Sequence, residues 1–459
     1  MDRRKRNIIV ACAVLVVLVA GYIALSLLDG EDQVPQDALI DVLTLTESDI
    51  VGIAYDFAGD DLSFTRVLGE GWHLREDRDF PLDETLPENM AHVASSIQAS
   101  GKAEGASLTN PDFGFTDPIS TVTLTLKDGS ARTFTIGSKN AVTGEYYLNL
   151  DGSEDIYLVP AATAESFLYN LNALAAKPWP FQEGDTYSRV SVASEDLAID
   201  FISYEEGWSD YYSREIYWFV DGVHEERVAG NMPNILTFLG NVVSLPLEKA
   251  VDYKPSEEEL ESYGLTRPVL SVNISYQRKS TLLTRLSAVI DIGDLDESGA
   301  FYHVRFRDQD VIWLSPRGDV ERILNFKQES FVSPKVLAIS SENVRGMDIT
   351  ARGREYRITA QGEGDDLSYA IGGRELTARA FKTFMTQLTN LTADIVTLEA
   401  SGEEEPVFSI SLTGAGGKSV YVAFIPYEDN FYIVRINGGE YLLISTEKVD
   451  AVIDALEAL

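Results

Sequence analysis

Cysteine is almost absent from this chain of 459 residues, in which Cys12 is the only one. One cysteine can form no intramolecular disulfide, so folding depends on the burial of apolar side chains, which make up 45% of the residues. Outside the segment that contains Cys12, thiolate catalysis and thiolate metal ligation are also excluded.

Histidine is scarce as well. The chain has four, and their spacing matches no common metal site. We interpret them as packed or surface residues: His73, His92, His224 and His303.

Basic residues are outnumbered, with 37 Lys and Arg against 73 Asp and Glu, which gives a net charge of −36. Such a field repels phosphate groups and anionic lipid head groups. We therefore expect no nucleic-acid binding and no flat association with a bilayer surface. Solubility is the simplest role for this acidity.

Sequence motifs of catalysis are missing too. The chain contains no Gly-x-Ser-x-Gly or His-Glu-x-x-His sequence. A glycosidase needs two carboxylates that face each other across a cleft, and acidic pairs such as Asp60-Asp61 are too frequent here to single one out. We expect a protein without enzymatic activity and without a cofactor.

Two short segments resemble binding loops. Residues 414–419 (Gly-Ala-Gly-Gly-Lys-Ser) resemble the end of a phosphate-binding loop, but Leu412 stands at its first glycine and a strand-like run follows. Residues 294–299 resemble the start of a calcium loop, but Arg305 stands where a bidentate glutamate is required. We interpret both as ordinary turns, with weak calcium binding at the second as the open alternative.

A long apolar run lies near the N-terminus. Residues 8–28 carry no charge and are numerous enough for a helix to cross a bilayer. The four basic residues within 1–7 predict a cytoplasmic tail, a transmembrane helix at 8–28, a linker at 29–40 and an extracytoplasmic remainder. A cleaved signal peptide would have a shorter apolar core. A lipobox at 9–12 would stand after such a core, whereas here the core begins there.

Three segments repeat the same order of patterns: 41–180, 181–330 and an abbreviated 331–459. Each has alternating strand-like runs, a helical pattern, further strands and a closing helix. We expect helices near 87–100, 162–174, 233–243, 316–326 and 377–391, with Ser315 as the cap of the fourth. The predicted fold class is α+β, a transmembrane helix followed by three tandem modules of antiparallel sheet with flanking helices.

A six-residue motif occurs in the first two repeats, at 113–118 (Phe-Gly-Phe-Thr-Asp-Pro) and 263–268 (Tyr-Gly-Leu-Thr-Arg-Pro). Before the second copy, Ser256 and Glu259 have the spacing of a capping box, and Gly264 suits the left-handed end of a helix. The final proline directs the chain into the next strand. The motif is therefore predicted to be structural.

Aromatic residues gather in the second repeat. Core packing on a sheet is the simpler explanation, and an exposed interaction patch is the alternative. The residues of this cluster are Trp208, Tyr211, Tyr212, Tyr217, Trp218 and Phe219.

Several short motifs resemble those of a bacterial envelope family, the domain of unknown function 4340. They are Gly71-Trp72-His73-Leu74, the two six-residue motifs, the pairs Ile136-Gly137 and Ile292-Gly293, and the strands with Tyr146-Tyr147 and Phe301-Tyr302. The resemblance implies association with ABC-type export systems of the kind linked to gliding motility, and it supplies no catalytic residues.

Together these patterns favour a non-enzymatic, membrane-anchored accessory or scaffold protein of an ABC-type transporter or envelope complex. Its expected partners are the ATPase, permease or auxiliary subunits. An extracytoplasmic solute- or glycan-binding module is the alternative, and an anchored hydrolase is less favoured. The sequence does not identify a small-molecule ligand.

Overall fold

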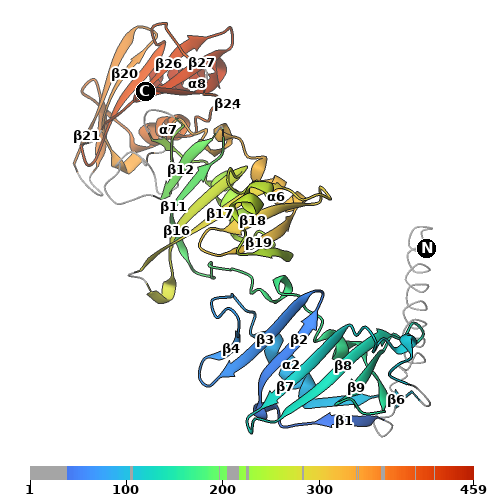
Figure 1. Ribbon diagram of the computed structural model, residues 1–459. Helices are drawn as coiled ribbons and strands as arrows, with labels where there is room; N and C mark the ends of the chain where they lie inside the picture. The colour runs from blue at the N-terminus through green and yellow to red at the C-terminus, as the bar shows by residue number, and fades with distance from the viewer. Residues whose placement is uncertain are drawn as a thin grey trace, which may run out of the picture. The chain divides into compact units, whose positions relative to one another are not determined.

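The computed structural model describes residues 39–103, 107–195, 197–203, 217–223, 227–281, 284–337, 339, 341–362, 367–398, 400–417 and 419–459. The chain divides after Lys177 into two compact units. Antiparallel sheets with helices build both units, which confirms the predicted α+β class (Figure 1). Within these ranges no helix is long and apolar enough to cross a membrane. The predicted span at 8–28 lies outside them.

The first unit contains an eight-stranded sheet of order β4-β3-β2-β7-β8-β9-β10-β6 and a separate pair, β1 and β5. Its elements are β1 (Ile40–Thr44), β2 (Ile50–Phe57), β3 (Asp60–Val67), β4 (Gly71–Leu74), α2 (Thr85–Ser95), β5 (Ser96–Ala99), β6 (Gly101–Lys102), the 3-10 turn η3 (Pro111–Phe113), β7 (Ser120–Leu126), β8 (Ala131–Lys139), β9 (Tyr146–Leu150), β10 (Ile156–Val159), α3 (Ala161–Glu165) and the 3-10 turn η4 (Asn172–Leu174).

The second unit begins with a nine-stranded sheet of order β14-β13-β12-β11-β16-β17-β18-β19-β15. Its elements are β11 (Thr186–Ala193), β12 (Ala198–Ser203), β13 (Trp218–Asp221), β14 (Val228–Ala229), α4 (Met232–Val243), β15 (Lys249–Tyr253), α5 (Glu257–Ser262), β16 (Leu270–Gln277), β17 (Arg285–Leu295), β18 (Phe301–Phe306), β19 (Val311–Pro316) and α6 (Arg317–Leu324).

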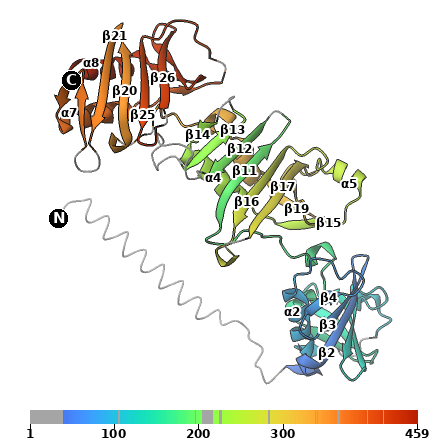
Figure 2. The same ribbon diagram turned by 90° about the vertical axis from the view of Figure 1, so that its left-hand side faces the viewer.

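A second nine-stranded sheet follows, with the order β23-β22-β21-β20-β25-β26-β27-β28-β24. Helices α7 and α8 lie side by side on one of its faces (Figure 2). The elements are β20 (Val344–Ala351), β21 (Arg354–Gln361), β22 (Ser368–Ile371), β23 (Arg374–Leu376), α7 (Ala378–Thr389), β24 (Ile395–Val396), β25 (Phe408–Gly414), β26 (Ser419–Tyr427), β27 (Phe431–Ile436), β28 (Gly439–Ser445) and α8 (Thr446–Glu457).

The three large sheets have one connectivity, and we call the segments that contain them modules 1, 2 and 3. In each, a first meander runs outward from a central strand: β2, β11 or β20. A helix and a short strand at the opposite edge follow. A second meander then starts beside the central strand, at β7, β16 or β25, and ends in a helix.

Alternation of apolar and polar residues builds these sheets, because successive strand side chains point to opposite faces. In module 1, for example, Ile53, Tyr55, Val122 and Leu124 are all at most 3% exposed, whereas Thr123, between the last two, is partly exposed. Helix α2 covers the apolar face of this sheet, to which it contributes Met90 and Ala94, both fully buried.

Several predicted helix limits were wrong. The helix predicted at 87–100 ends at Ser95, because residues 96–99 form β5 and pair with β1. The helix predicted at 162–174 is α-helical only over Ala161–Glu165. Pro316, not Ser315, precedes the first residue of α6, and Ser315 is fully buried in β19 opposite Tyr302.

Module 3 has as many strands as module 2. Its shortening lies in several connections, among them the one between β24 and β25, where the described residues form no counterpart of α5.

Candidate functional site

The six-residue motif and the Ile-Gly pair form one structural unit in module 2. Gly264 has a φ of +70° and follows Tyr263, the C-cap residue of α5, so it provides the left-handed end of this helix, as predicted. We call the six-residue motif the helix-ending segment. Gly293 lies in β17 directly beneath this segment, and a Cβ there would overlap the carbonyl oxygen of Tyr263. The Tyr263 ring lies on the His303 ring of β18, with 4.6 Å between centroids.

Module 1 repeats this arrangement. A Cβ at Gly137 would overlap the carbonyl oxygen of Phe113, and the Phe113 ring meets the Tyr147 ring edge-on, with 4.8 Å between centroids. In both modules the strand register shifts directly after the isoleucine of the Ile-Gly pair, so the glycine lies within the irregularity. The glycine therefore provides the space in which the helix-ending segment rests on the sheet.

The start of this segment in module 2 is fixed by hydrogen bonds. Ser256 and Glu259 form the predicted capping box at α5. The Tyr263 hydroxyl donates a 3.0 Å hydrogen bond to Asp252 Oδ2. The pKa of Tyr263 is raised to about 12. Burial is the largest cause, and this hydrogen bond is the second.

Module 3 fills the same place differently. Phe424 pairs with Phe408, the first residue of β25, just as Ile292 pairs with Leu270, the first residue of β16. Ile425 therefore stands where module 2 has Gly293. Its side chain is fully buried in a cluster with Ile433 and Leu443.

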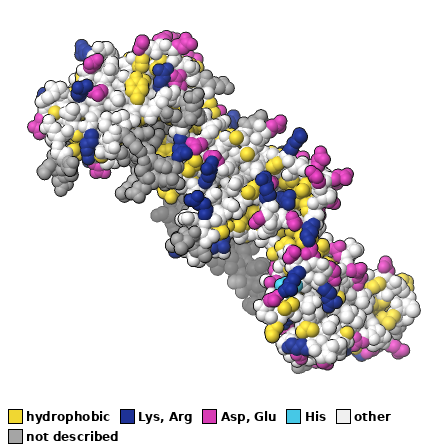
Figure 3. Space-filling view, turned by 60° about the vertical axis from the view of Figure 1, so that its left-hand side comes forward, with side chains coloured by type: hydrophobic (Ala, Val, Ile, Leu, Met, Phe, Trp, Pro, Cys, Tyr) yellow, Lys and Arg dark blue, Asp and Glu magenta, His cyan; other side chains and the backbone are white. Residues whose placement is uncertain are grey.

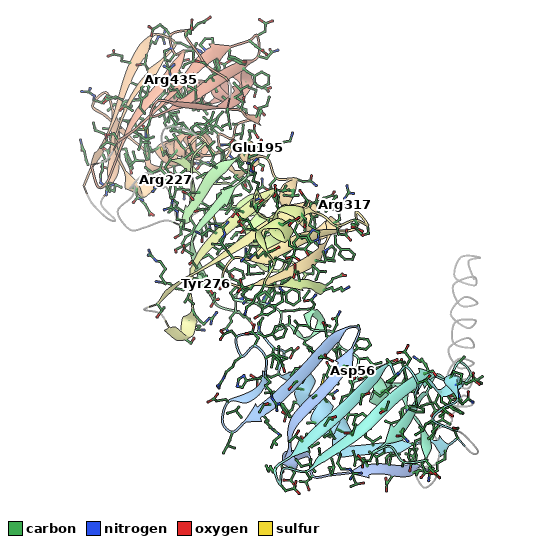
Figure 4. All side chains as sticks on the ribbon, viewed as in Figure 1. Asp56, Glu195, Arg227, Tyr276, Arg317 and Arg435 are labelled. Atoms are coloured by element: carbon green, nitrogen blue, oxygen red, sulfur yellow. The ribbon has the colours of Figure 1, made fainter. Side chains whose placement is uncertain are left out.

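The connection to β25 is held over this cluster by polar contacts. Arg435, labelled in Figure 4, donates a 2.9 Å hydrogen bond to the Gly402 carbonyl, and Glu440 accepts one of 2.8 Å from the Gly402 amide. Arg435 and Glu440 also form an ion pair.

The Gly-Trp motif of module 1 attaches β4 to α2. Gly71 leaves room for the carboxylate of Glu84, which accepts the amide of Trp72 at 3.3 Å. The Trp72 indole Nε1 donates to Glu88 Oε2 at 2.8 Å, and Arg66 Nη2 donates to Glu88 Oε1 at 2.9 Å. The hydrogen bonds of the Glu84 and Glu88 carboxylates therefore join these elements to one another.

The two loop-like segments form turns. Residues 414–417 lead from β25 towards β26, and the Gly417 amide donates to the Gly414 carbonyl. In the turn after β17, the Asp296 carboxylate accepts the Ser298 hydroxyl and the amides of Ala300 and Phe301. The Ser298 hydrogen bond is the main reason that the pKa of Asp296 lies below its usual value.

Potential metal ligands do not cluster in the part of the chain that the structure describes. Within the described ranges, no group of three or more His, Cys, Asp or Glu could hold a metal ion. Acidic side chains are scattered over the face seen in Figure 3 and do not gather in one patch. Asp291 is only 4% exposed, but Arg307 neutralises it through two hydrogen bonds of 2.7 and 2.9 Å.

The aromatic cluster is placed only in part. Trp218 and Phe219 lie in β13 and are each 3% exposed, so both are buried in the packing of module 2. Tyr217 is 50% exposed. The other three residues of the predicted patch (Trp208, Tyr211 and Tyr212) lie outside the described residues, and a surface role for the patch remains a prediction.

A groove of about 1100 Å³ opens at one end of the module 2 sheet. One wall is the turn between β11 and β12, where Glu195 is labelled in Figure 4. The opposite wall is the end of α6 and the segment that follows it. We call this the module 2 groove. Its lining includes Val192, Ser194, Glu195, Leu197, Phe238, Arg267, Val269, Leu270, Asp294, Ile323, Phe326, Lys327, Glu329 and Phe331.

The groove combines an apolar floor with a charged rim. Phe238, Leu270 and Phe331 are at most 5% exposed, and the rings of Phe326 and Phe331 stack with centroids 5.3 Å apart. None of these residues was predicted as a site. The groove joins segments more than a hundred residues apart, and the sequence contains no signal for it beyond the strand and helix pattern.

Comparison with known proteins gives one match. The family model described as Domain of unknown function (DUF4340) matches residues 72–220 and again residues 218–407. Each match begins at a tryptophan strand, β4 or β13. No curated protein and no solved structure shows significant similarity to the chain. Since the two matches cover most of its length, the chain belongs to the DUF4340 family.

Proposed function

We propose that this protein is a non-enzymatic, membrane-anchored scaffold, an extracytoplasmic accessory subunit of an ABC-type transporter or envelope complex. The apolar, uncharged residues 8–28 with basic residues before them support the anchor and its orientation. The family's implied association with export systems supports the kind of complex.

The observation that carries the scaffold role is the use of the motif side chains in packing. Glu84 and Glu88 hold β4 on α2 in module 1. Asp252 and Glu259 hold the helix-ending segment of module 2. Repeated modules whose polar motif groups join their own elements suit a protein that presents surfaces to partners.

The test is chemical cross-linking in membranes, followed by purification of the full chain in mild detergent and mass spectrometry. We expect an ATPase, a permease or an auxiliary subunit to be enriched. The matched control is the same chain with residues 8–28 replaced by an unrelated apolar span, which should recover less of the complex if the helix itself docks. Recovery of no transporter subunit with the native chain would contradict the proposal.

A ligand-binding module is the second candidate, because the module 2 groove is large enough for a small solute. A purified chain that binds a solute or glycan, with affinity lost when Val269 on the groove rim is replaced by aspartate, would favour this alternative.

A further inference from the structure

The walls of the module 2 groove have counterparts in the other two modules. The turn between the first two strands is residues 58–59 in module 1, 194–197 in module 2 and 352–353 in module 3. The part of the chain that faces it is the segment after the closing helix in modules 1 and 2, where that helix is α3 or α6, and the closing helix α8 itself in module 3.

In module 1 the turn and the facing segment are bonded to each other. Asp60, just after the turn, accepts the backbone amide of Leu171 at 2.8 Å through Oδ2. The hydroxyl of Tyr55 donates to the Tyr169 carbonyl at 2.9 Å. The chain's own polypeptide therefore occupies this end of the sheet.

In module 3 an arginine closes the same place. Arg352 in the turn forms ion pairs with Asp454 at 2.8 Å, Asp450 at 3.1 Å and Glu457 at 3.4 Å, all on α8. Helix α8 has 12 residues, whereas α6 of module 2 has 8. The longer helix supplies the acidic face that the turn residue binds.

The residue equivalent to Arg352 is Glu195. Ala351 pairs with Phe408, the first residue of β25, while Ala193 pairs with Ser271, the second residue of β16. In each module we take the turn residue one position beyond the residue that is opposite the first residue of β16 or β25. This residue is Glu195 in module 2 and Arg352 in module 3. Module 2 thus has the opposite charge at this position.

The described residues of module 2 show no such closure. Among the described residues of 194–197 and 325–331, no hydrogen bond or ion pair joins the two walls, and the groove separates them. Val269 on the rim is 40% exposed. The lining of the groove carries three carboxylates (Glu195, Asp294 and Glu329) and two cationic side chains (Arg267 and Lys327).

We infer that the module 2 groove is a docking site for a polypeptide segment of a partner protein, one that carries lysine or arginine beside apolar residues. Polypeptide fills the equivalent place in modules 1 and 3. Glu195 in place of Arg352 selects a basic segment, as does the net charge of −36. The apolar floor takes the apolar side chains.

This inference extends the scaffold proposal by naming the chemistry of a partner. The test needs no transporter, so its failure would leave the cross-linking result untouched. The full chain in phosphatidylcholine nanodiscs is titrated into a fluorescent 12-residue peptide of alternating leucine and lysine. A leucine–glutamate peptide of equal length is the comparison, and empty nanodiscs give the background.

We expect the lysine peptide to bind at least about tenfold more tightly than the glutamate peptide. Glu195→Lys and Val269→Asp should each weaken its binding by about tenfold, because one reverses the selecting charge and the other places a charge at the apolar rim. Glu154→Lys, in an exposed turn of module 1, and Val142→Asp, at a side chain that is 93% exposed, should leave the affinity unchanged.

Equal weakening by Glu195→Lys and Glu154→Lys would mean that only the overall charge attracts the peptide, and the site would be rejected. An unchanged affinity of Val269→Asp would also reject it. Binding of laurate that depends on Val269, without peptide binding, would show a lipid site and overturn the inference.

Discussion

At the residue scale, Gly293 and Gly137 hold the decisive positions of modules 2 and 1. Neither has a positive φ. Their role is therefore to leave space, since a Cβ at either would overlap a backbone carbonyl oxygen of the helix-ending segment. Backbone cannot move aside as a flexible side chain can.

Gly293→Ala should therefore destabilise module 2. We expect a loss of about 1–3 kcal/mol in the free energy of unfolding, the usual cost of overpacking. Urea denaturation followed by tryptophan fluorescence would measure it. The control is Gly240→Ala in α4, where a Cβ meets no atom within 4 Å. Alanine favours a helix, so this variant should be as stable as the native chain or more so. A Gly293→Ala chain of native stability would refute the packing argument.

Tyr263 predicts a pH effect on the same segment. Its pKa is raised from 10.0 to about 12, first by burial and second by the hydrogen bond to Asp252. Between these pH values the unfolded chain loses the proton while the folded chain keeps it. Stability from this group is thus complete below pH 10 and is lost as the pH rises towards 12.

The urea midpoint of the native chain should therefore fall as the pH rises from 10 to about 12, the interval between the unfolded and the folded pKa of Tyr263. In Tyr263→Phe the fall should be smaller, because the ionising group is gone. Other tyrosines contribute to both chains and cancel in the comparison. An equal fall in the two chains would show that Tyr263 ionises equally in the folded and unfolded states.

Sequence reasoning succeeded at this scale where the signal is local. Ser256, Glu259 and Gly264 lie within nine positions, and their capping and left-handed roles follow from residue type and spacing alone. The contact between Gly293 and Tyr263 joins residues 30 positions apart on different elements. Both motifs were visible in the sequence, but their meeting depends on how the chain crosses the sheet.

At the element scale, the ends of helices depend on tertiary pairing. Residues 96–99 continue an apolar helical pattern, since Ile97 follows Met90 and Val93 on one face. In the structure Ile97 and Ala99 are fully buried in β5, which pairs with β1. Pairing with a strand more than fifty residues earlier overrides the helical propensity of residues 96–99. The local sequence does not indicate this pairing.

The short helix α5 tests how far capping supports an element. It has 6 residues, too few to be stable without its caps and packing. Ser256→Ala removes the hydroxyl that accepts the Glu259 amide and should cost about 1 kcal/mol. Equilibrium unfolding in urea would measure this. Ser262→Ala is the matched control in the same helix, because its hydroxyl only donates to the Glu259 carbonyl. Equal losses in the two variants would contradict a specific capping role.

At the scale of the whole molecule, the repeated connectivity was predictable and the groove was not. Turns, alternation and motif order recur along the chain, so the sequence indicates three sheets of one kind. The groove depends on the length of α6 and on which residue stands at the tip of one hairpin. The equivalence of Glu195 and Arg352 follows only from the strand registers of the two sheets.

The division of the chain into two units predicts two stages of unfolding. The sheet strands of residues 39–177 pair only within that unit. Modules 2 and 3, in contrast, are joined by the segment between them. The Ser333 amide donates to the Ala229 carbonyl at 2.8 Å, and the Ala393 amide donates to the Pro334 carbonyl at 2.8 Å.

Calorimetry of residues 39–177 alone should therefore show one cooperative transition at the temperature that this unit has in the whole chain. Residues 178–459 should also unfold in one transition, because the backbone hydrogen bonds of the connecting segment couple modules 2 and 3. Ser333→Pro removes the donor to Ala229 and should split that transition into two, while it leaves the first unit unchanged. A fragment 39–177 that fails to fold would show that the first unit needs the second, and an undivided transition in Ser333→Pro would place the coupling elsewhere.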